Sequence, residues 1–297
     1  MSGDRLLASD LAVLASATEA HSSVPAQVDV ELATAPAGHT FVSRQRVAYP
    51  FHLGRCLYAP QDPPGMPTLY IQSCSGGIFE HDHLGWRVVA GERTQAHITS
   101  SASTIVHSMA AGEAAQVVMI EARAGSYLEY LPDPLILFRG ARVHSRVRVR
   151  LHPEATVLVC DSLVPHDPGG DGGAFDWIAA ELRVEDLDGA LLARDRYRLH
   201  GGTLSQNLPG ITGPWRCQGG FVALSRRVTV ADLVTSLRAA MPDECDVYAG
   251  VTKLPGECGA WVRVLAHDAA ALREALRRAW YSARKSLLGA EPIPRRK

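Results

Sequence analysis

Short runs in which apolar and polar residues alternate fill most of this chain, and they constrain its fold more than any other feature. From about residue 28 to residue 225 the period is close to two, as in 28–32 and in the β-branched runs 116–121 and 156–160. Side chains of a strand point alternately to opposite faces, so this period indicates strands with one buried face. The sequence therefore predicts a mainly β protein.

Turn signals recur just before new apolar runs. Glycine or proline stands within 90–92, 111–113, 124–126 and 152–154. These residues favour tight turns, and units of strand, turn and strand bury their apolar faces by stacking on one another. We therefore predict a layered, β-helix-like body of many short strands, although the unequal spacing excludes a strict repeat.

Two helices are predicted in the last quarter of the chain. The first begins near Asp232 and would end at Pro242, and the second begins after the capping residue Asp268 and ends at Gly289, before Pro292. Each has apolar residues at helical spacing, as expected for a helix packed against the β body. The apolar residues are Leu233, Val234, Leu237 and Met241 in the first helix, and Leu272, Leu276, Trp280, Ala283 and Leu287 in the second.

Residues 1–27 are rich in Ala and Ser and have weak periodicity, so we interpret them as a loose N-terminal extension. Nothing between the two predicted helices is typical of a linker, and we expect residues 28–297 to form a single domain. The chain has no apolar run of about 18 residues and no secretory leader, which predicts a cytoplasmic protein without a membrane span. Its six cysteines form no close pair, so reduced thiols are expected rather than a disulfide framework or a zinc knuckle.

The string Glu80-His81-Asp82-His83 is the most unusual local feature. In a regular strand His81 and His83 would share one face and could hold nickel or zinc, and a metal-dependent enzyme is the alternative function that this string would support. A metal site needs a further ligand, which the sequence does not reveal. Two half-exposed histidines at a strand edge, with Asp82 accepting backbone N–H bonds after a turn, are the structural alternative.

A basic stripe is expected on one strand, because arginine and histidine alternate there with valine and leucine. RNA could bind such a stripe, but it has no aromatic residues on the same face, and the net charge of the chain is -1. A solvated face or a patch for a protein partner is therefore favoured over nucleic acid. The stripe consists of Arg142, His144, Arg146, Arg148 and Arg150.

Sequence motifs for common catalytic sites are missing. The glycines at 169–173 are not followed by Lys and Ser or Thr, so they do not form a P-loop, and no serine lies in a Gly-x-Ser-x-Gly pattern. These absences favour a binding or scaffold protein over an enzyme.

Three segments, 46–55, 69–84 and 128–141, carry a distinctive set of residues. Their most characteristic members are Arg46, Tyr49, Pro50, Gly76, Gly77, Glu129 and Pro132. Together with Trp280 and Arg284 near the C-terminus, these segments resemble the UreD family of urease accessory proteins, also called UreH. The resemblance extends from about residue 28 to the C-terminus.

The resemblance implies a β-helix-like body with two helices and a role without catalysis. Proteins of this family bind apo-urease and the accessory protein UreF, which recruits the GTPase UreG carrying nickel. The resemblance therefore implies that GTP acts only through UreG, that Ni²⁺ is in transit, and that no cofactor is tightly bound. It also implies a scaffold or chaperone that assists nickel insertion into urease.

The chain departs from the family pattern beside the Gly-Gly segment. The family usually has Gly before the acid at this place and often Arg after it, whereas His81 and His83 stand here. Glycine often marks a backbone with positive φ, so the substitution bears on the local conformation, and it could also add a nickel ligand.

Three acids, Asp82, Asp161 and Asp195, match acidic positions of the family pattern. Each stands beside strand-like apolar sequence, where an unpaired carboxylate is costly to bury. One hypothesis is structural: ion pairs or hydrogen bonds satisfy the acids, and Arg194 and Arg196 flank Asp195. The other hypothesis is that the three acids line a hydrated tunnel that conducts Ni²⁺.

Overall fold

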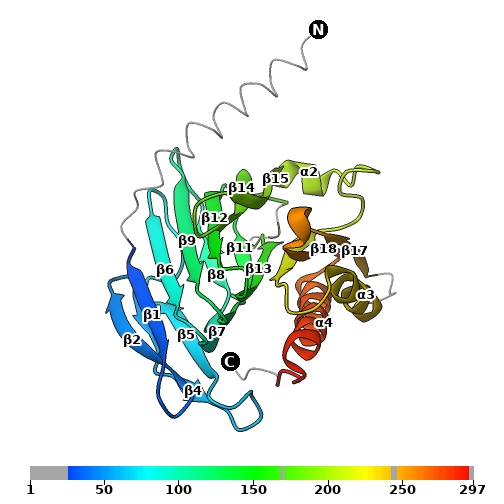
Figure 1. Ribbon diagram of the computed structural model, residues 1–297. Helices are drawn as coiled ribbons and strands as arrows, with labels where there is room; N and C mark the ends of the chain where they lie inside the picture. The colour runs from blue at the N-terminus through cyan, green and yellow to red at the C-terminus, as the bar shows by residue number, and fades with distance from the viewer. Residues whose placement is uncertain (1–25, 168–169, 171, 242–245, 294–297) are drawn as a thin grey trace.

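The computed structural model describes residues 26–167, 170, 172–241 and 246–293. Two facing sheets form a β-solenoid of about four turns (Figure 1). In spatial order, the first sheet contains β15 (Leu191–His200), β14 (Trp177–Asp186), β12 (Arg142–Leu151), β9 (Ala114–Ala122), β6 (His83–Ala90), β1 (Val28–Thr34) and β2 (Thr40–Val47).

The second sheet runs, in spatial order, through β17 (Val247–Lys253), β18 (Gly259–Ala266), β16 (Cys217–Leu224), β13 (Thr156–Pro165), β10 (Tyr127–Tyr130), β7 (Gln95–Ser100), β5 (Pro67–Ser73) and β3 (Phe51–Leu53). Three short strands join it: β4 (Leu57–Tyr58), β8 (Thr104–Val106) and β11 (Leu135–Leu137). The prediction of a mainly β, layered body is confirmed.

Successive turns of the solenoid stack in parallel register. Strands β6, β9, β12 and β14 pair in parallel in the first sheet, as do β5, β7, β10 and β13 in the second. The turns between the sheets are stacked too, because Arg123 N donates to Ala90 O at 3.0 Å and His152 N donates to Ala122 O at 2.9 Å. The turn signals at 90–92, 124–126 and 152–154 thus mark one corner of the solenoid, whereas 111–113 precedes β9 at the other end of the first sheet's strands.

Apolar residues of both sheets fill the space between them. Val30, Val88 and Ile120 from the first sheet and Leu128 and Val157 from the second are each at most 2% exposed. Their alternation with outward side chains is the period-two pattern of the sequence. This packing fixes the register, since a slip by one residue would expose the buried face.

Helices α3 (Val230–Ala240) and α4 (Ala269–Leu288) pack on the outer face of the second sheet (Figure 1). The side chain of Asp268 accepts a hydrogen bond from Ala271 N at 2.8 Å, and Gly289 ends α4 with a φ of 67°. Both boundaries of α4 agree with the prediction. Helix α3 starts two residues earlier than expected, because Thr229 caps it; Pro242, its predicted end, lies outside the described residues.

Two short helical segments were not predicted, α2 (Gly201–Ser205) and the 3-10 turn η1 (Pro255–Glu257). They are too short to produce a helical period in the sequence. Most of the predicted N-terminal extension, residues 1–27, lies outside the described residues. Among the described helices, none combines the length and apolar character needed to cross a bilayer.

Candidate functional site

A row of polar side chains interrupts the apolar interior between the two sheets. Gln116 in β9, Ser145 in β12 and Tyr197 in β15 lie at inward positions of one register row, together with Ala180. Gln116 Nε2 donates to Ser145 Oγ at 2.9 Å. These residues line a cavity of about 60 Å³, which is large enough for water.

Asp161 faces this cavity from the second sheet. It lies on β13 between the inward residues Val159 and Leu163, and the hydroxyl of Tyr197 donates to its Oδ2 at 3.5 Å. Burial, the largest cause, and the charge of Asp195 raise the pKa of Asp161, Arg263 and Tyr197 oppose the shift, and the net pKa is about 6. The carboxylate is therefore only weakly stabilised in its ionised form, as expected for a group that has no close cationic partner in the described part of the chain.

Asp195 lines a smaller cavity of about 20 Å³, which Asp161 and Tyr197 also line. The Arg263 guanidinium donates to Asp195 Oδ2 at 2.6 Å. The expectation that the flanking arginines neutralise Asp195 is wrong. Neighbouring residues of a strand point to opposite faces, so Arg194 and Arg196 lie on the outside of the sheet, and the partner comes from β18.

The indole of Trp261 also lines the smaller cavity, and its Nε1–H is buried without a hydrogen-bond partner among the described residues. A buried donor of this kind is commonly satisfied by an ordered water. The polar groups in the two cavities can thus bind water, although apolar side chains form the larger part of each lining.

The cavity between the sheets adjoins a groove of about 540 Å³ beside α4. Both are lined by Pro132, Asp133, Cys160 and Ser162, so these residues lie where the interior meets the surface. Asp133 is held by Ser100, whose Oγ accepts its N–H at 2.8 Å. Burial raises the pKa of the Cys160 thiol, so Cys160 is a neutral thiol rather than a thiolate ligand.

Sequence patterns did not point to Asp133. The signal that could have found it is an acid between two prolines directly after a buried strand. Gln116 and Ser145 were not found from the sequence either. The signal in their case is a polar residue at an inward position of a strand whose other inward residues are mostly apolar. Such positions can be recognised only after the register is known.

Glycine in β16 leaves space beside Asp161. A Cβ at Gly220 would overlap Asp161 Oδ1 and would lie 3.2 Å from Trp261 Nε1. Gly220 pairs with Asp161 across the two strands. The absence of a side chain at Gly220 therefore gives the Asp161 carboxylate room beside Trp261.

Asp82 is not among the residues that line these cavities. Its Oδ2 accepts a hydrogen bond from Phe79 N at 2.8 Å, which closes the turn before β6. Asp82 thus has the structural role given as the alternative above, and the three acids are not brought together.

The expectation that His81 and His83 share one face of a strand is wrong. His81 lies in a turn with a φ of 67°, and β6 begins only at His83. His83 Nδ1 lies 2.9 Å from His81 O. No group of three or more His, Cys, Asp or Glu side chains able to hold a metal ion occurs within the described ranges.

Glu80 anchors a distant loop. Its carboxylate accepts hydrogen bonds from the backbone N–H groups of Ala110, Ala111 and Gly112, which lowers the pKa of Glu80 to about 2. The left-handed backbone of His81 is the conformation that glycine favours, so the turn keeps its shape without the usual glycine. A Cβ at Gly112 would overlap the His81 ring, so Gly112 provides the space for this side chain.

The remaining motif residues serve several parts of the fold. Arg46 lies on β2, Tyr49 is 77% exposed, and Pro50 is buried. Gly76 and Gly77 have positive φ, and a Cβ at Gly77 would lie 2.5 Å from Ile105 O.

Glu129, the last of these motif residues, is fully buried and forms an ion pair with Arg284. Burial alone would raise the pKa of Glu129, but hydrogen bonds from Arg284 and His97 outweigh it and lower the pKa. Tyr127 also donates to this carboxylate, at 2.8 Å. Glu129 is thus a structural anchor beneath α4.

Comparison with known proteins gives a consistent result. The family model described as "UreD urease accessory protein" matches residues 24–297. Urease accessory protein UreD 1 of Pseudomonas syringae pv. syringae is 45% identical over 280 residues, which cover 93% of this chain and 98% of the relative. UreD 1 of Methylorubrum extorquens is 34% identical over 272 residues, which cover 91% of this chain and 92% of the relative. UreD 2 of Streptomyces griseus is 35% identical over a region that covers 81% of this chain and 85% of the relative.

Proposed function

Because the chain belongs to the UreD family of urease accessory proteins, we propose that it is a non-catalytic scaffold that conducts Ni²⁺ during urease maturation. In this proposal the chain binds apo-urease and UreF, and UreF brings UreG, which carries nickel and hydrolyses GTP. The proposal also assigns this role to the cytoplasm.

One observation supports the nickel path: the groove beside α4 shares lining residues with the cavity between the sheets, and that cavity shares lining residues with the cavity at Asp195. Asp133 lies at the junction with the groove, Asp161 lies between the two inner cavities, and Asp195 lies in the last one. The path therefore offers single carboxylates in sequence.

Spaced carboxylates suit a moving ion. Carboxylates with water bind Ni²⁺ less tightly than clustered imidazole or thiolate ligands do, so an ion can leave each site for the next. Ion pairing with Arg263 weakens the hold of Asp195 on a cation, and the raised pKa of Asp161 allows a proton to replace the departing ion. The neutral thiol of Cys160 would not trap the metal.

The alternative of a metal-dependent enzyme at 80–83 receives no support. The Glu80 carboxylate is occupied by backbone N–H groups, and Asp82 closes a turn. We therefore do not propose a catalytic role for this segment.

The test is urease activation in a reconstituted system with Asp161→Leu or Asp195→Leu. We expect urease activity and nickel content to fall while the complex with UreF and apo-urease still assembles. Asp82→Asn is the matched control, because this acid lies outside the cavities and Asn retains an oxygen that can accept the Phe79 hydrogen bond. Full activation by both leucine variants would rule out the path. Loss of the complex with UreF and apo-urease would indicate that these acids have a structural role instead.

A further inference from the structure

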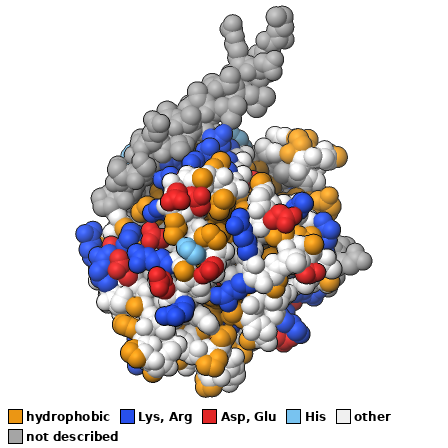
Figure 2. Space-filling model, in the orientation of Figure 1, with side chains coloured by type: hydrophobic (Ala, Val, Ile, Leu, Met, Phe, Trp, Pro, Cys, Tyr) orange, Lys and Arg blue, Asp and Glu red, His pale blue; other side chains and the backbone are white. Residues whose placement is uncertain are grey.

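Arginine dominates the outer face of the first sheet, with more than twice as many arginines as carboxylates. The whole chain has a net charge of -1, so the excess on this face is balanced elsewhere on the molecule. Acidic and basic side chains are interspersed on the face seen in Figure 2. The outward arginines are Arg44, Arg46, Arg87, Arg142, Arg146, Arg148, Arg150, Arg183, Arg194, Arg196 and Arg198, and the outward acids are Asp29, Glu31, Glu121, Glu181 and Glu185.

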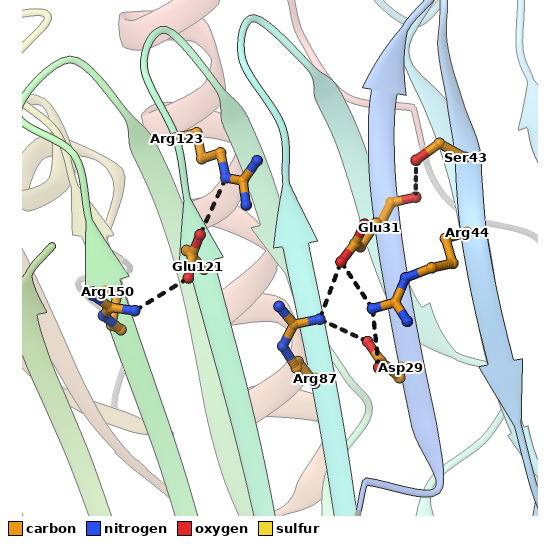
Figure 3. A network of polar contacts seen from close by, with 8 residues as sticks. All are labelled: Asp29, Glu31, Ser43, Arg44, Arg87, Glu121, Arg123 and Arg150. Atoms are coloured by element: carbon orange, nitrogen blue, oxygen red, sulfur yellow. Dashed lines mark hydrogen bonds and ion pairs between the residues drawn. The ribbon is translucent and has the colours of Figure 1, made fainter.

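The half of the sheet near β1 neutralises its own charges. Asp29 and Glu31 accept hydrogen bonds from Arg44 and Arg87 at 2.8–3.3 Å (Figure 3). The hydrogen bonds from Arg44 and Arg87 lower the pKa of Glu31. This half therefore offers few free charges to a partner.

The half formed by β12, β14 and β15 does not neutralise its charges. Its carboxylates are already paired, Glu181 with Arg194 at 2.6 Å and Glu185 with Arg183 at 2.5 Å. Four guanidinium groups remain that make no hydrogen bond or ion pair with any carboxylate in the described ranges. We call them the cationic patch, and it consists of Arg146, Arg148, Arg196 and Arg198.

Register places the patch residues on adjacent strands. Arg146 and Arg196 both pair with Glu181 from opposite sides, and Arg148 pairs with Arg183. Neighbouring strands are about 4.8 Å apart, so Arg148 and Arg183 repel each other, whereas Glu181 attracts Arg146 and Arg196. Burial lowers the pKa of Arg146, which is only 8% exposed. Glu181 and Glu113 offset part of the electrostatic cost at Arg146, but none of the four guanidinium groups has an ion-pair partner of its own within the described ranges.

A carboxylate-rich surface would offset this cost, because guanidinium groups bind carboxylates with two parallel hydrogen bonds. Arg198 is already ordered by stacking on Trp177 at 4.4 Å, and its Nε is buried without a partner among the described residues. Nucleic acid fits less well, because Glu181 and Glu185 stand among the arginines and would repel phosphates, and Arg198 covers the neighbouring aromatic ring.

We propose that the cationic patch binds a carboxylate-rich surface of a protein partner in the urease assembly. The identity of that partner rests on the proposed function, whereas its chemistry rests on the patch. Asp195 lies between Arg194 and Arg196 on β15 with its side chain on the inner face. A partner bound to the patch therefore covers the strand that carries the Asp195 end of the path.

The test compares Arg148→Glu/Arg196→Glu with the control Arg226→Glu/Lys253→Glu, which reverses two exposed charges outside the first sheet. Binding of the full chain to cognate apo-urease and to cognate UreF is measured at low and high salt. We expect the patch variant to lose at least about tenfold in affinity for one of the two proteins, with a weaker salt dependence. The control should bind both like the native chain. Equal binding by all three forms would overturn the proposal.

Two further probes separate the remaining outcomes. If the native chain binds neither protein, the proposed function fails, and a decaglutamate peptide then tests the patch alone. Loss of peptide binding in the patch variant would support an acidic partner. Unchanged peptide binding would refute the proposal. A short RNA duplex is the second probe. Patch-dependent binding of the duplex, with protein binding unaffected, would identify nucleic acid as the occupant and overturn the proposal.

Discussion

Arg284 in α4 donates two hydrogen bonds to Glu129 in β10, at 2.7 and 2.6 Å, although 155 residues separate them in the chain. Both side chains are fully buried. Arg284 also donates to Asp62 at 2.7 Å, and His97 Nδ1 lies 2.7 Å from Glu129. This network joins the C-terminal helix to the second sheet.

Removal of one partner from this network should be severe. Arg284→Met leaves the carboxylates of Glu129 and Asp62 buried without their cation, and we expect a loss of about 3–5 kcal/mol in the free energy of unfolding. Lys285→Met is the control, because its ion pair with Glu291 is exposed, and it should unfold like the native chain. Denaturant titration checks both; equal midpoints for the two variants would contradict the structural role of Arg284.

The apolar face of α4 should be equally sensitive to charge. Leu276 is 8% exposed and packs in the core between α4 and the second sheet, so Leu276→Asp should lower stability by several kcal/mol. Arg273→Asp on the exposed side of the same helix should have little effect. Thermal melting distinguishes them, and an unchanged midpoint for Leu276→Asp would make α4 a peripheral element.

The titration of Asp161 should make the stability of the protein depend on pH. Its pKa is about 6 in the folded protein, against 3.8 for an ordinary Asp, so between about pH 4 and 6 the folded chain binds more protons than the unfolded chain. The contribution of Asp161 to the free energy of unfolding should therefore fall by about 1–3 kcal/mol in total as pH rises through this window. Above the window it should stay constant. Asp161→Asn should remove this fall and raise stability at neutral pH. Denaturant titrations across the window check it; parallel curves for the two proteins would exclude a raised pKa.

A substitution at Gly220 should block the proposed nickel path without loss of the fold. Gly220→Ala places a Cβ against Asp161 and Trp261, so the carboxylate must move, and we expect urease activation to fall while the complex still forms. Gly250→Ala is the matched control in β17, because a Cβ there would point into open space, with no described residue beyond its chain neighbours within 4 Å. Nickel content of urease is the readout. Equal activation by both variants would show that the space beside Asp161 is not needed.

Local signals in the sequence were sufficient for the strands, for α4 and for the family. The period-two pattern depends only on which side of a strand is buried, and the ends of α4 depend on Asp268 and Gly289, which act within one helical turn. The family resemblance rests on contiguous segments, which the comparisons confirm over residues 24–297.

Only the tertiary structure decided which acids share a cavity and what neutralises each of them. Asp161 and Asp195 meet because β13 and β15 face each other across the interior, whereas Asp82 is held in a turn by Phe79. The partner of Asp195 is Arg263, 68 residues away, and not the arginines beside it. Sequence sets the local conformation and the face of each side chain, but the contacts that tune a buried charge come from strands and helices distant in the chain.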